Sequence, residues 1–180
     1  SRIPKNRKKQ MSHSMAASSD MLEPFNYFLH PGYIFVASKP TVISLVLGSC
    51  VSVSLYDRRR KTGGMNHFMY PFTAEKSKAT ARYGNVSTLA LIQMMLEDGS
   101  KSEDIQAQIM GGAYNPQFSD KNIGTENIII ARKVLHRKGI AILSEDTGGE
   151  LGRKIVFNTH SNELAIIKVE KLRNDDWYPY

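Results

Sequence analysis

Hydrophobic and polar residues alternate along several short segments of this chain, a pattern typical of β-strands with two unlike faces. The clearest case is VSVSLY at 51–56, where Val51, Val53 and Leu55 share one face and two serines share the other. Apolar segments bounded by glycine, proline or charged residues predict further strands. These segments lie at residues 32–38, 41–47, 64–70, 104–113, 140–146, 153–159 and 163–171.

Two other segments carry apolar residues at helical spacing. The first helix is expected over Asn85–Asp98, capped by Asn85 and ended by Gly99. The second is expected over Asn122–Lys138 and is closed by Gly139. Two helices among about seven or more strands, several of them joined as hairpins, predict an α+β fold with a largely antiparallel sheet.

Composition fits one globular domain, since the chain has 180 residues and 41% of them are hydrophobic. The net charge of +7 comes largely from the start of the chain. Residues 1–20 hold five of the 24 lysines and arginines and one of the 17 acidic residues, which leaves 19 against 16, or +3. We therefore expect a basic, disordered tail over residues 1–26 and a single domain over 27–180.

Several functional classes are disfavoured by the same composition. The basic tail lacks interleaved aromatic residues, so nucleic acid is not an expected partner. No apolar run is long enough for membrane insertion, and no signal segment follows the basic N-terminus. Cys50 is the only cysteine, which fits a reducing, cytoplasmic compartment. Neither a metal-ligand cluster nor a phosphate-binding glycine loop is present, so we expect no metal and no cofactor.

Cys50 and His67 form the candidate chemical pair. If the valines of residues 51–56 face the core, Cys50 lies on the polar side of its strand with the serines. His67 lies on the expected return strand, so the hairpin could bring the two side chains together. A free thiol is mostly protonated at neutral pH, and a neighbouring imidazole can accept its proton. The alternative is that Cys50 is a small buried hydrophobic residue.

Residues around this pair suggest how a substrate could be held. Gly48 and Ser49 allow a tight turn whose backbone N–H groups could stabilise a developing oxyanion. Gly64 leaves room near the histidine, and Asn66 completes the candidate oxyanion and substrate-binding set. Ser44, on the preceding strand, is the candidate for orienting the histidine.

Five blocks of this sequence, in order, resemble the chemoreceptor glutamine deamidases of bacterial chemotaxis, the CheD family. The blocks are LGSCVSVSLYD, GGMNHFMYP, QIMGGA, NIG at 122–124 and EDTGGELGRKI, and the resemblance extends from Gly32 to Lys171. In that family the first block supplies a cysteine nucleophile, the second its histidine base, and the preceding strand a catalytic threonine. These roles fall on Cys50, His67 and Ser44, with serine in place of threonine. The glycines of the last block either shape a substrate groove or serve turns.

The resemblance also implies a fold and an activity for the single domain. The fold would be a largely antiparallel, β-sandwich-like core with two or three helices outside, like the cytotoxic necrotizing factor-like cysteine deamidases. The activity would be hydrolysis of glutamine side-chain amides, a linear C–N bond, to glutamate plus ammonia without a cofactor. The expected partners are the cytoplasmic helical regions of methyl-accepting chemotaxis receptors, and a chemotaxis phosphatase is a further candidate.

Three rival interpretations remain open at the level of sequence. The chain could be a non-catalytic chemotaxis regulator that binds receptors or a phosphatase. It could bind nucleic acid through its tail, which predicts strongly salt-dependent binding that is lost without residues 1–20. A thiol protease with the same pair would release a peptide terminus instead of ammonia.

Overall fold

The computed structural model describes residues 23–170 of the chain. Within this range there are nine strands and two α-helices. The strands are β1 (Phe25–Phe28), β2 (Ile34–Val36), β3 (Thr41–Leu47), β4 (Val51–Asp57), β5 (Thr62–Asn66), β6 (Ile105–Gly111), β7 (Ala141–Thr147), β8 (Gly152–Asn158) and β9 (Leu164–Val169). The helices are α1 (Gly84–Glu97) and α2 (Ile123–Arg137).

The strands form two mixed sheets, one with the order β1-β3-β8-β9 and one with the order β2-β5-β4-β6-β7. The pairs β1–β3 and β6–β7 are parallel, and the other neighbouring pairs are antiparallel. The expected α+β class is confirmed. The parallel pairs were not expected, because the sequence pattern reveals hairpins but not contacts between distant strands. The finer likeness to the necrotizing factor-like deamidases stays a prediction.

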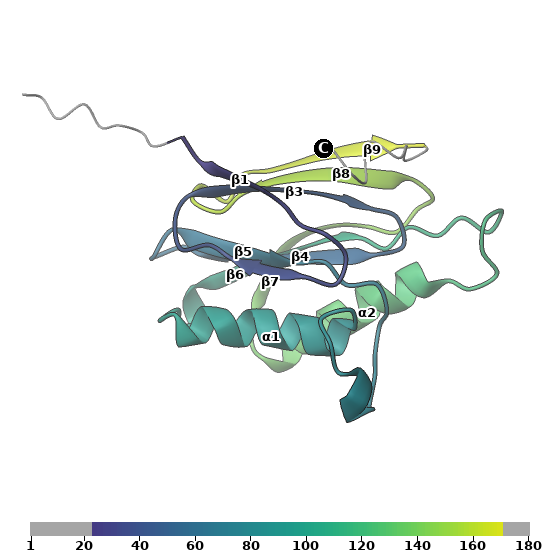
Figure 1. Ribbon diagram of the computed structural model, residues 1–180, viewed down its shortest axis with the longest axis horizontal. Coiled ribbons are helices and arrows are strands. Elements are labelled where there is room, and N and C mark those ends of the chain that lie inside the picture. Colours follow the sequence, from purple (N-terminus) through teal and green to yellow (C-terminus); the bar gives the residue numbers. More distant parts are fainter. Residues whose placement is uncertain (1–22, 171–180) are drawn as a thin grey trace, which may run out of the picture.

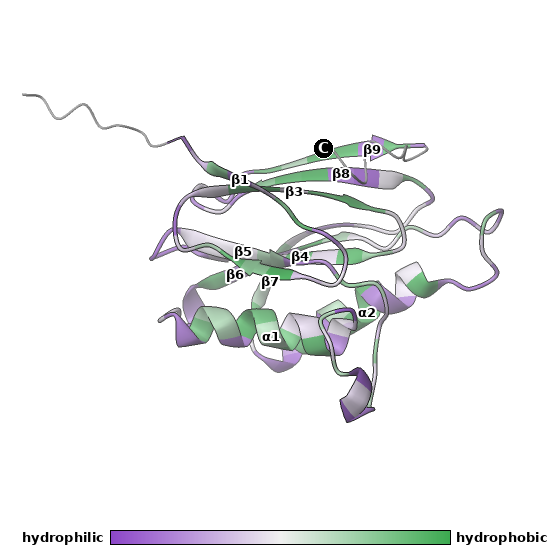
Figure 2. Ribbon diagram, viewed as in Figure 1, coloured by the Kyte–Doolittle hydropathy of each residue, from purple (hydrophilic) through white to green (hydrophobic). Residues whose placement is uncertain are grey.

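The molecule is built in three layers, with the two sheets face to face and both helices beneath the five-stranded sheet (Figure 1). One core cluster lies between the sheets and includes Ile43 and Phe157 from one sheet and Met65 and Met110 from the other. A second cluster lies between the five-stranded sheet and the helices. Hydrophilic residues are concentrated in the connections, including the long loop before α2 (Figure 2). The five-stranded sheet is therefore covered on both faces.

This burial corrects one expectation about β4. Val51, Val53 and Leu55 share one face as expected, and that face packs on the helix side. The opposite face is not a solvent-exposed polar side, because Ser52 and Ser54 are fully buried between the sheets. Cys50, next to the start of β4, packs against the cluster between the sheets. The alternate serines of β4 therefore mark a second buried face of the strand and not a face open to solvent.

The helix ends follow the sequence with one exception. Asn122 caps α2, since its side chain accepts a hydrogen bond from Thr125 N, and Gly139 follows the end of α2 with a φ of 68°. Gly99 ends α1 with a φ of 108°. However, α1 begins one residue earlier than expected, and Asn85 does not cap it. Its side chain instead donates to Thr73 O and accepts from Thr73 N in the preceding loop.

Strand β1 was not predicted from the sequence. It begins at Phe25, so Phe25 and Asn26, which we assigned to the tail, belong to the four-stranded sheet. Residues 1–22 of the expected tail lie outside the described residues.

Candidate functional site

The strand register places Cys50 and His67 on the same face of the five-stranded sheet. Val51 pairs with Phe68 in an antiparallel bridge, with hydrogen bonds of 3.1 and 3.0 Å in the two directions. His67 is therefore opposite Ser52, and Cys50 is its diagonal neighbour. Diagonal neighbours have Cα atoms about 7–8 Å apart, within reach of side chains that turn toward one another. This face is turned toward the four-stranded sheet, since Tyr56 and Met65, which share it, belong to the cluster between the sheets.

The imidazole of His67 has one defined tautomer. Its Nδ1 lies 3.0 Å from the backbone oxygen of Leu29. Because a carbonyl can only accept, Nδ1 must carry the proton, and Nε2 is left with its lone pair. Nε2 is buried and has no hydrogen-bond partner within the described residues. It is therefore a fixed, unoccupied proton acceptor on the face that it shares with Cys50.

Both groups are neutral at pH 7 in this structure. Burial raises the pKa of the Cys50 thiol to about 11, and its own backbone N–H opposes this shift only in part. Burial lowers the pKa of His67 to about 4, with the Leu29 contact opposing the shift and His30 adding to it. Because the pKa of the thiol is far above that of the imidazole, the proton stays on the sulfur. The shared face of the sheet thus carries a neutral thiol and a neutral imidazole, and not a preformed thiolate–imidazolium pair.

We expect the alkylation rate of Cys50 by iodoacetamide to rise about tenfold per pH unit from pH 7 to 10, because the reactive thiolate is a minor species throughout. The rate is measured by intact mass on the folded protein, in which Cys50 is the only thiol. The same chain in denaturant is the control, since its exposed thiol should reach a plateau above its ordinary pKa of about 8.5. A plateau near neutral pH in the folded protein would contradict the neutral pair.

The structure separates the side chain of Ser44 from the histidine. Residues 41, 43, 45 and 47 of β3 are buried, whereas Ser44 is half-buried and is paired with Val156, which is exposed. Its side chain therefore lies on the outer face of the four-stranded sheet. The group that holds His67 is the Leu29 carbonyl, and Leu29 N in turn donates to Ser44 O at 2.9 Å. Ser44 is thus connected to the His67 ring only through backbone hydrogen bonds, by way of Leu29.

The turn before Cys50 has all of its carbonyl groups engaged. Gly48 O accepts from Ala113 N at 3.0 Å, and Cys50 O accepts from Gly112 N at 2.9 Å. Ser49 O accepts from the side-chain Nδ2 of Asn127 at 2.9 Å. Within residues 23–170, neither Ser49 N–H nor Cys50 N–H has a hydrogen-bond partner in another residue. The Cys50 N–H also acts on its own sulfur, whose pKa it lowers. The oxyanion-binding role expected for the turn at Gly48 and Ser49 stays a prediction.

Glycines bring α2 close to this turn. A Cβ on Gly124 would lie 2.4 Å from Gly112 O, and a Cβ on Gly111 would lie 2.3 Å from Cys50 O. Gly111 and Gly112 also have φ values of 104° and 72°, which favour glycine. The sequence blocks QIMGGA and NIG therefore allow the end of β6 and the first turn of α2 to pack against the Cys50 backbone. Their contribution to the site is structural.

Two residues expected to bind substrate have a structural role here instead. Gly64 is buried in the sheet, where a Cβ would lie 2.5 Å from Phe35 O, so it makes room for strand β2 and not for a substrate. Asn66 is fully buried, accepts from Val53 N at 2.7 Å and donates to Thr88 Oγ1 at 3.3 Å. Thr88 is on α1, so the Asn66 side chain lies on the helix side of the sheet, away from His67.

An open cavity of about 490 Å³ borders the Cys50 turn. Gly48 and Ser49 line one side, and the loop before α2, which carries the exposed Phe118, lines another. A second groove of about 560 Å³ is lined by residues of both helices and contains none of the candidate site residues. The first cavity is the better candidate for a substrate groove, because Gly48 and Ser49, which directly precede Cys50, line it. Neither Cys50 nor His67 lines this cavity.

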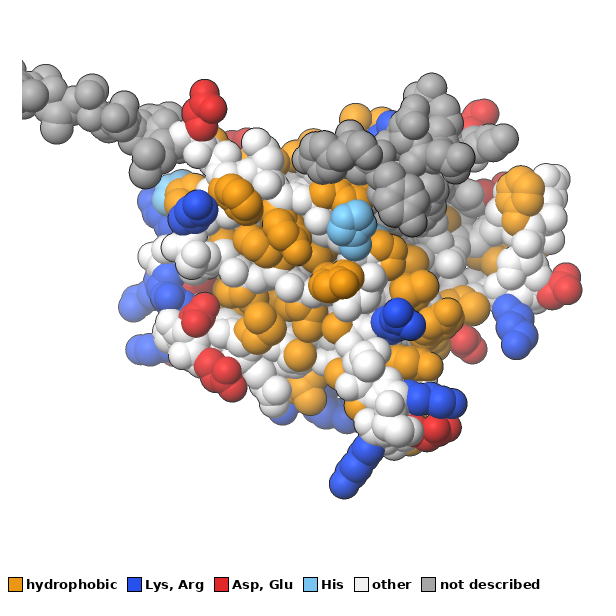
Figure 3. Space-filling model, viewed as in Figure 1, with side chains coloured by type: hydrophobic (Ala, Val, Ile, Leu, Met, Phe, Trp, Pro, Cys, Tyr) orange, Lys and Arg blue, Asp and Glu red, His pale blue; other side chains and the backbone are white. Residues whose placement is uncertain are grey.

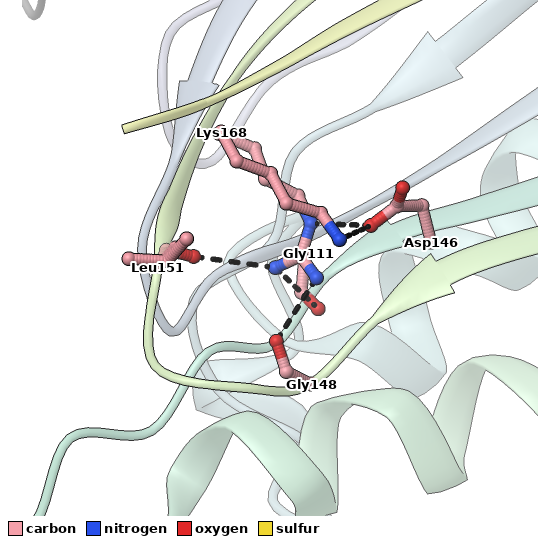
Figure 4. Close-up of polar contacts among 6 residues, drawn as sticks. Gly111, Asp146, Gly148, Leu151 and Lys168 are labelled. Carbon is pink, nitrogen blue, oxygen red and sulfur yellow. Dashed lines mark hydrogen bonds and ion pairs between the residues drawn. The ribbon is translucent and has the colours of Figure 1, made fainter. Parts of the chain in front are cut away.

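A buried arginine, Arg153, joins the two sheets through Asp146 and Gly148, which are labelled in Figure 4. From β8 its Nε donates to Asp146 Oδ1 at 2.9 Å, and its Nη2 donates to Gly148 O at 2.9 Å. Lys168 Nζ lies 3.4 Å from the same Asp146 oxygen. Burial would raise the pKa of Asp146, but the Arg153 and Lys168 contacts outweigh it and lower that pKa. Gly148 and Gly149 have φ values of 80° and 68°, so both serve the turn.

Sequence reasoning did not single out Arg153 or Asn127. Arg153 alternates with Ile155 and Phe157 on the inner face of β8, and all three are buried. A cation at an inward position of a strand is the signal that could have identified it. Asn127 shares the buried face of α2 with Gly124, Ile128 and Ala131, so a polar residue within an apolar helix face is the matching signal.

The described residues offer no metal site and no membrane-spanning helix. No group of three or more His, Cys, Asp or Glu side chains in residues 23–170 could hold a metal ion. Neither helix in that range combines the length and apolar character needed to cross a bilayer.

The described residues form a layered α+β protein in which Cys50 and a buried imidazole share one face of a sheet. The family model described as CheD chemotactic sensory transduction matches residues 69–168. A "Probable chemoreceptor glutamine deamidase CheD" of Sulfurimonas denitrificans is 37% identical over 80% of this chain and 94% of its own length. Proteins with the same name are 41% identical in Trichlorobacter lovleyi, over 78% and 88% of the two chains, and 34% identical in Methanococcus vannielii, over 79% and 95%. The chain belongs to the CheD family, as the ordered sequence blocks predicted.

Proposed function

We propose that this protein is a chemoreceptor glutamine deamidase that uses Cys50 as nucleophile and His67 as base. The observation that carries the proposal is the unoccupied Nε2 of His67, whose tautomer is fixed by Leu29 on the face shared with Cys50. The names of the curated relatives support the same activity. No cofactor takes part in the chemistry.

The first half of the reaction forms a thioester. The Cys50 sulfur attacks the side-chain amide carbon of a glutamine while its proton moves to Nε2 of His67. Because the resting thiol is neutral, this proton leaves during the attack and not before it. The negative charge on the amide oxygen faces the free N–H groups of the Cys50 turn. His67 then donates the proton to the departing nitrogen, the C–N bond breaks and ammonia leaves.

The second half hydrolyses the thioester. Nε2 of His67 is again a base and takes a proton from a water molecule as the water oxygen attacks the thioester carbon. The C–S bond breaks, the sulfur regains its proton, and the product is glutamate. Each event adds one negative charge to the substrate, which changes repulsion between neighbouring receptor helices.

An apolar surface supports the choice of a helical protein substrate. Hydrophobic side chains gather in the middle of the face seen in Figure 3, with charged residues around them. Tyr33, whose carbonyl accepts from His67 N, is 61% exposed, and Tyr70 is 41% exposed. Exposed aromatic side chains close to a candidate site are typical of protein-binding surfaces. We therefore propose that the cytoplasmic helical region of a chemotaxis receptor docks here.

A second candidate function is a non-catalytic regulator that binds receptors or a chemotaxis phosphatase. The specific observation in its favour is that neither Cys50 nor His67 lines the cavity that borders the turn at Gly48 and Ser49. The two functions make different predictions for partner binding without Cys50. A regulator keeps its whole effect after Cys50→Ala, whereas the deamidase keeps binding and loses ammonia release.

The test is ammonia release from the cytoplasmic fragment of a chemoreceptor incubated with the wild-type protein. Glutamate dehydrogenase coupling reports the ammonia, and a receptor fragment with its candidate glutamines replaced by glutamate is the control. Ammonia above that control supports deamidation. A new peptide terminus without ammonia would support a thiol protease instead.

We expect Ser44→Ala to change kcat/KM for deamidation by less than about threefold, because its side chain lies on the outer face of the other sheet. The same ammonia assay measures this effect. Ser44→Pro is a contrasting variant, since a ring at this position disturbs the strand whose carbonyl holds Leu29 N. A loss of about 100-fold or more in Ser44→Ala would show instead that the serine hydroxyl orients His67, as the family resemblance implies.

A further inference from the structure

Asn127 makes a buried contact to the Cys50 turn that the reaction above does not use. Its side chain is fully buried on α2, and its Nδ2 donates to Ser49 O at 2.9 Å and to Met69 O at 3.0 Å. Both neighbours are carbonyl acceptors, so the amide must present its NH₂ group to them. Both protons of that group are then used. One side chain thus joins the helix to the residue before Cys50 and to Met69, two residues after His67.

The contact to Ser49 has a consequence for the next N–H group. The peptide between Ser49 and Cys50 is trans, as are all peptides within residues 23–170. In a trans peptide the C=O and N–H bonds point in opposite directions. Holding Ser49 O toward α2 therefore turns the Cys50 N–H away from α2 and out of the turn. The neighbouring contacts of Gly48 O and Cys50 O fix the residues on either side.

The Cys50 N–H is the donor closest to the reacting atoms. An amide carbon attacked by the sulfur develops its negative oxygen within reach of the nucleophile's own backbone N–H, a common component of oxyanion holes. Such a donor assists only if its direction is fixed before the reaction. Without the Asn127 contact, the Ser49–Cys50 peptide could rotate to give its carbonyl another partner.

The reach of Asn127 depends on the glycines that bring α2 close. A Cβ on Gly124 would collide with Gly112 O and Ala113 O, at 2.4 and 2.5 Å. These glycines allow the first turns of α2 to lie against the loop, and Asn127 follows Gly124 by three residues, on the same side of the helix. The close packing at Gly124 and the hydrogen bonds of Asn127 therefore both hold α2 against the same part of the chain.

We propose that Asn127 is a positioning residue that fixes the Cys50 N–H as the oxyanion donor of the deamidation reaction. The proposal rests on the proposed function, since it assigns a role within that reaction. It distinguishes Asn127 from a residue that only stabilises the fold, because its effect should fall on the step in which the oxyanion forms.

The experiment compares two reactions of the same sulfur. Deamidation of a receptor cytoplasmic fragment passes through an oxyanion, whereas alkylation of Cys50 by iodoacetamide does not. For Asn127→Ala we expect kcat for ammonia release to fall about 100-fold with KM changed by less than about threefold. Alkylation should change by less than about threefold. Asn127→Leu, which is similar in size and lacks the NH₂ donors without adding a charge, should show the same split.

Asn85→Ala is the matched control. Asn85 also uses its side-chain amide to hold loop backbone from a helix, but its contacts are to Thr73, six residues after His67. Its kcat should equal that of the wild type at a temperature where circular dichroism shows all variants folded. This control separates loss of any helix–loop contact from loss of the contact to Ser49.

The possible results distinguish failure of the Asn127 positioning role from failure of the proposed deamidase function. An unchanged kcat in folded Asn127→Ala overturns the positioning role while wild-type activity still supports deamidation. A parallel fall in kcat and alkylation also overturns it, because Asn127 would then support the thiol in general. Absence of ammonia in the wild-type arm overturns the proposed function itself, and the role of Asn127 with it.

Discussion

Cys50→Ala is expected to lower the deamidation rate by at least about 10⁴-fold, because no other group in the site can form the covalent intermediate. The chain has no second cysteine to substitute for it. The substitution removes one half-buried sulfur next to the start of β4, so we expect the free energy of unfolding to fall by only about 1 kcal/mol. Receptor binding should persist. The rate is measured as ammonia released under single-turnover conditions.

Cys50→Ser is the matched variant, since it keeps the shape of the side chain and replaces the sulfur with a weaker nucleophile. It should bind the receptor fragment like the wild type and should also lose activity. If either variant retained more than about a tenth of the wild-type rate, the cysteine would not be the nucleophile. The site would then have to act by direct attack of water.

His67→Asn is expected to lower kcat by about 10²–10⁴-fold, because it removes the proton acceptor. The side-chain nitrogen of asparagine can still donate to Leu29 O. The substitution therefore keeps the hydrogen bond that His67 Nδ1 makes to this carbonyl. The loss should therefore fall on kcat and not on the folded fraction. It is measured with saturating receptor fragment from pH 6 to 9, where the wild-type His67 stays neutral because its pKa is about 4.

His160→Asn provides the comparison for this change. His160 also places Nδ1 near a backbone oxygen, that of Lys61 at 3.1 Å, but it lies in the turn between β8 and β9 and is exposed. The same substitution there should leave kcat within about twofold of wild type. Equal losses at both positions would mean that the assay reports stability instead of base catalysis.

Most elements of the fold could be predicted from local sequence pattern. Strand β3 occupies the segment expected for it, 41–47, and α2 differs from the expected range by one residue at each end. Contacts between distant segments could not be predicted in this way. Strand β1 was missed because four residues carry little periodicity, and its parallel partner lies more than ten residues further along the chain.

The candidate site was likewise predictable in part from local sequence pattern, and the rest of it depends on contacts between distant segments. The register of the hairpin places Cys50 and His67 on one face, as the alternation indicated. The Leu29 carbonyl could not be predicted, since every residue carries a carbonyl and only tertiary structure selects one. Gly64 and Asn66 were expected at the site because they precede the histidine. The pleat places the Asn66 side chain on the opposite face, and Gly64 gives its space to β2.

The most direct test of the central claim is mass-spectrometric mapping of a chemoreceptor cytoplasmic fragment after incubation with wild type, Cys50→Ala and His67→Asn. The account predicts that specific glutamines become glutamate with the wild-type protein, and that these conversions are absent with Cys50→Ala and much slower with His67→Asn. The same conversions at equal rates with all three proteins, or none with the wild type, would contradict it.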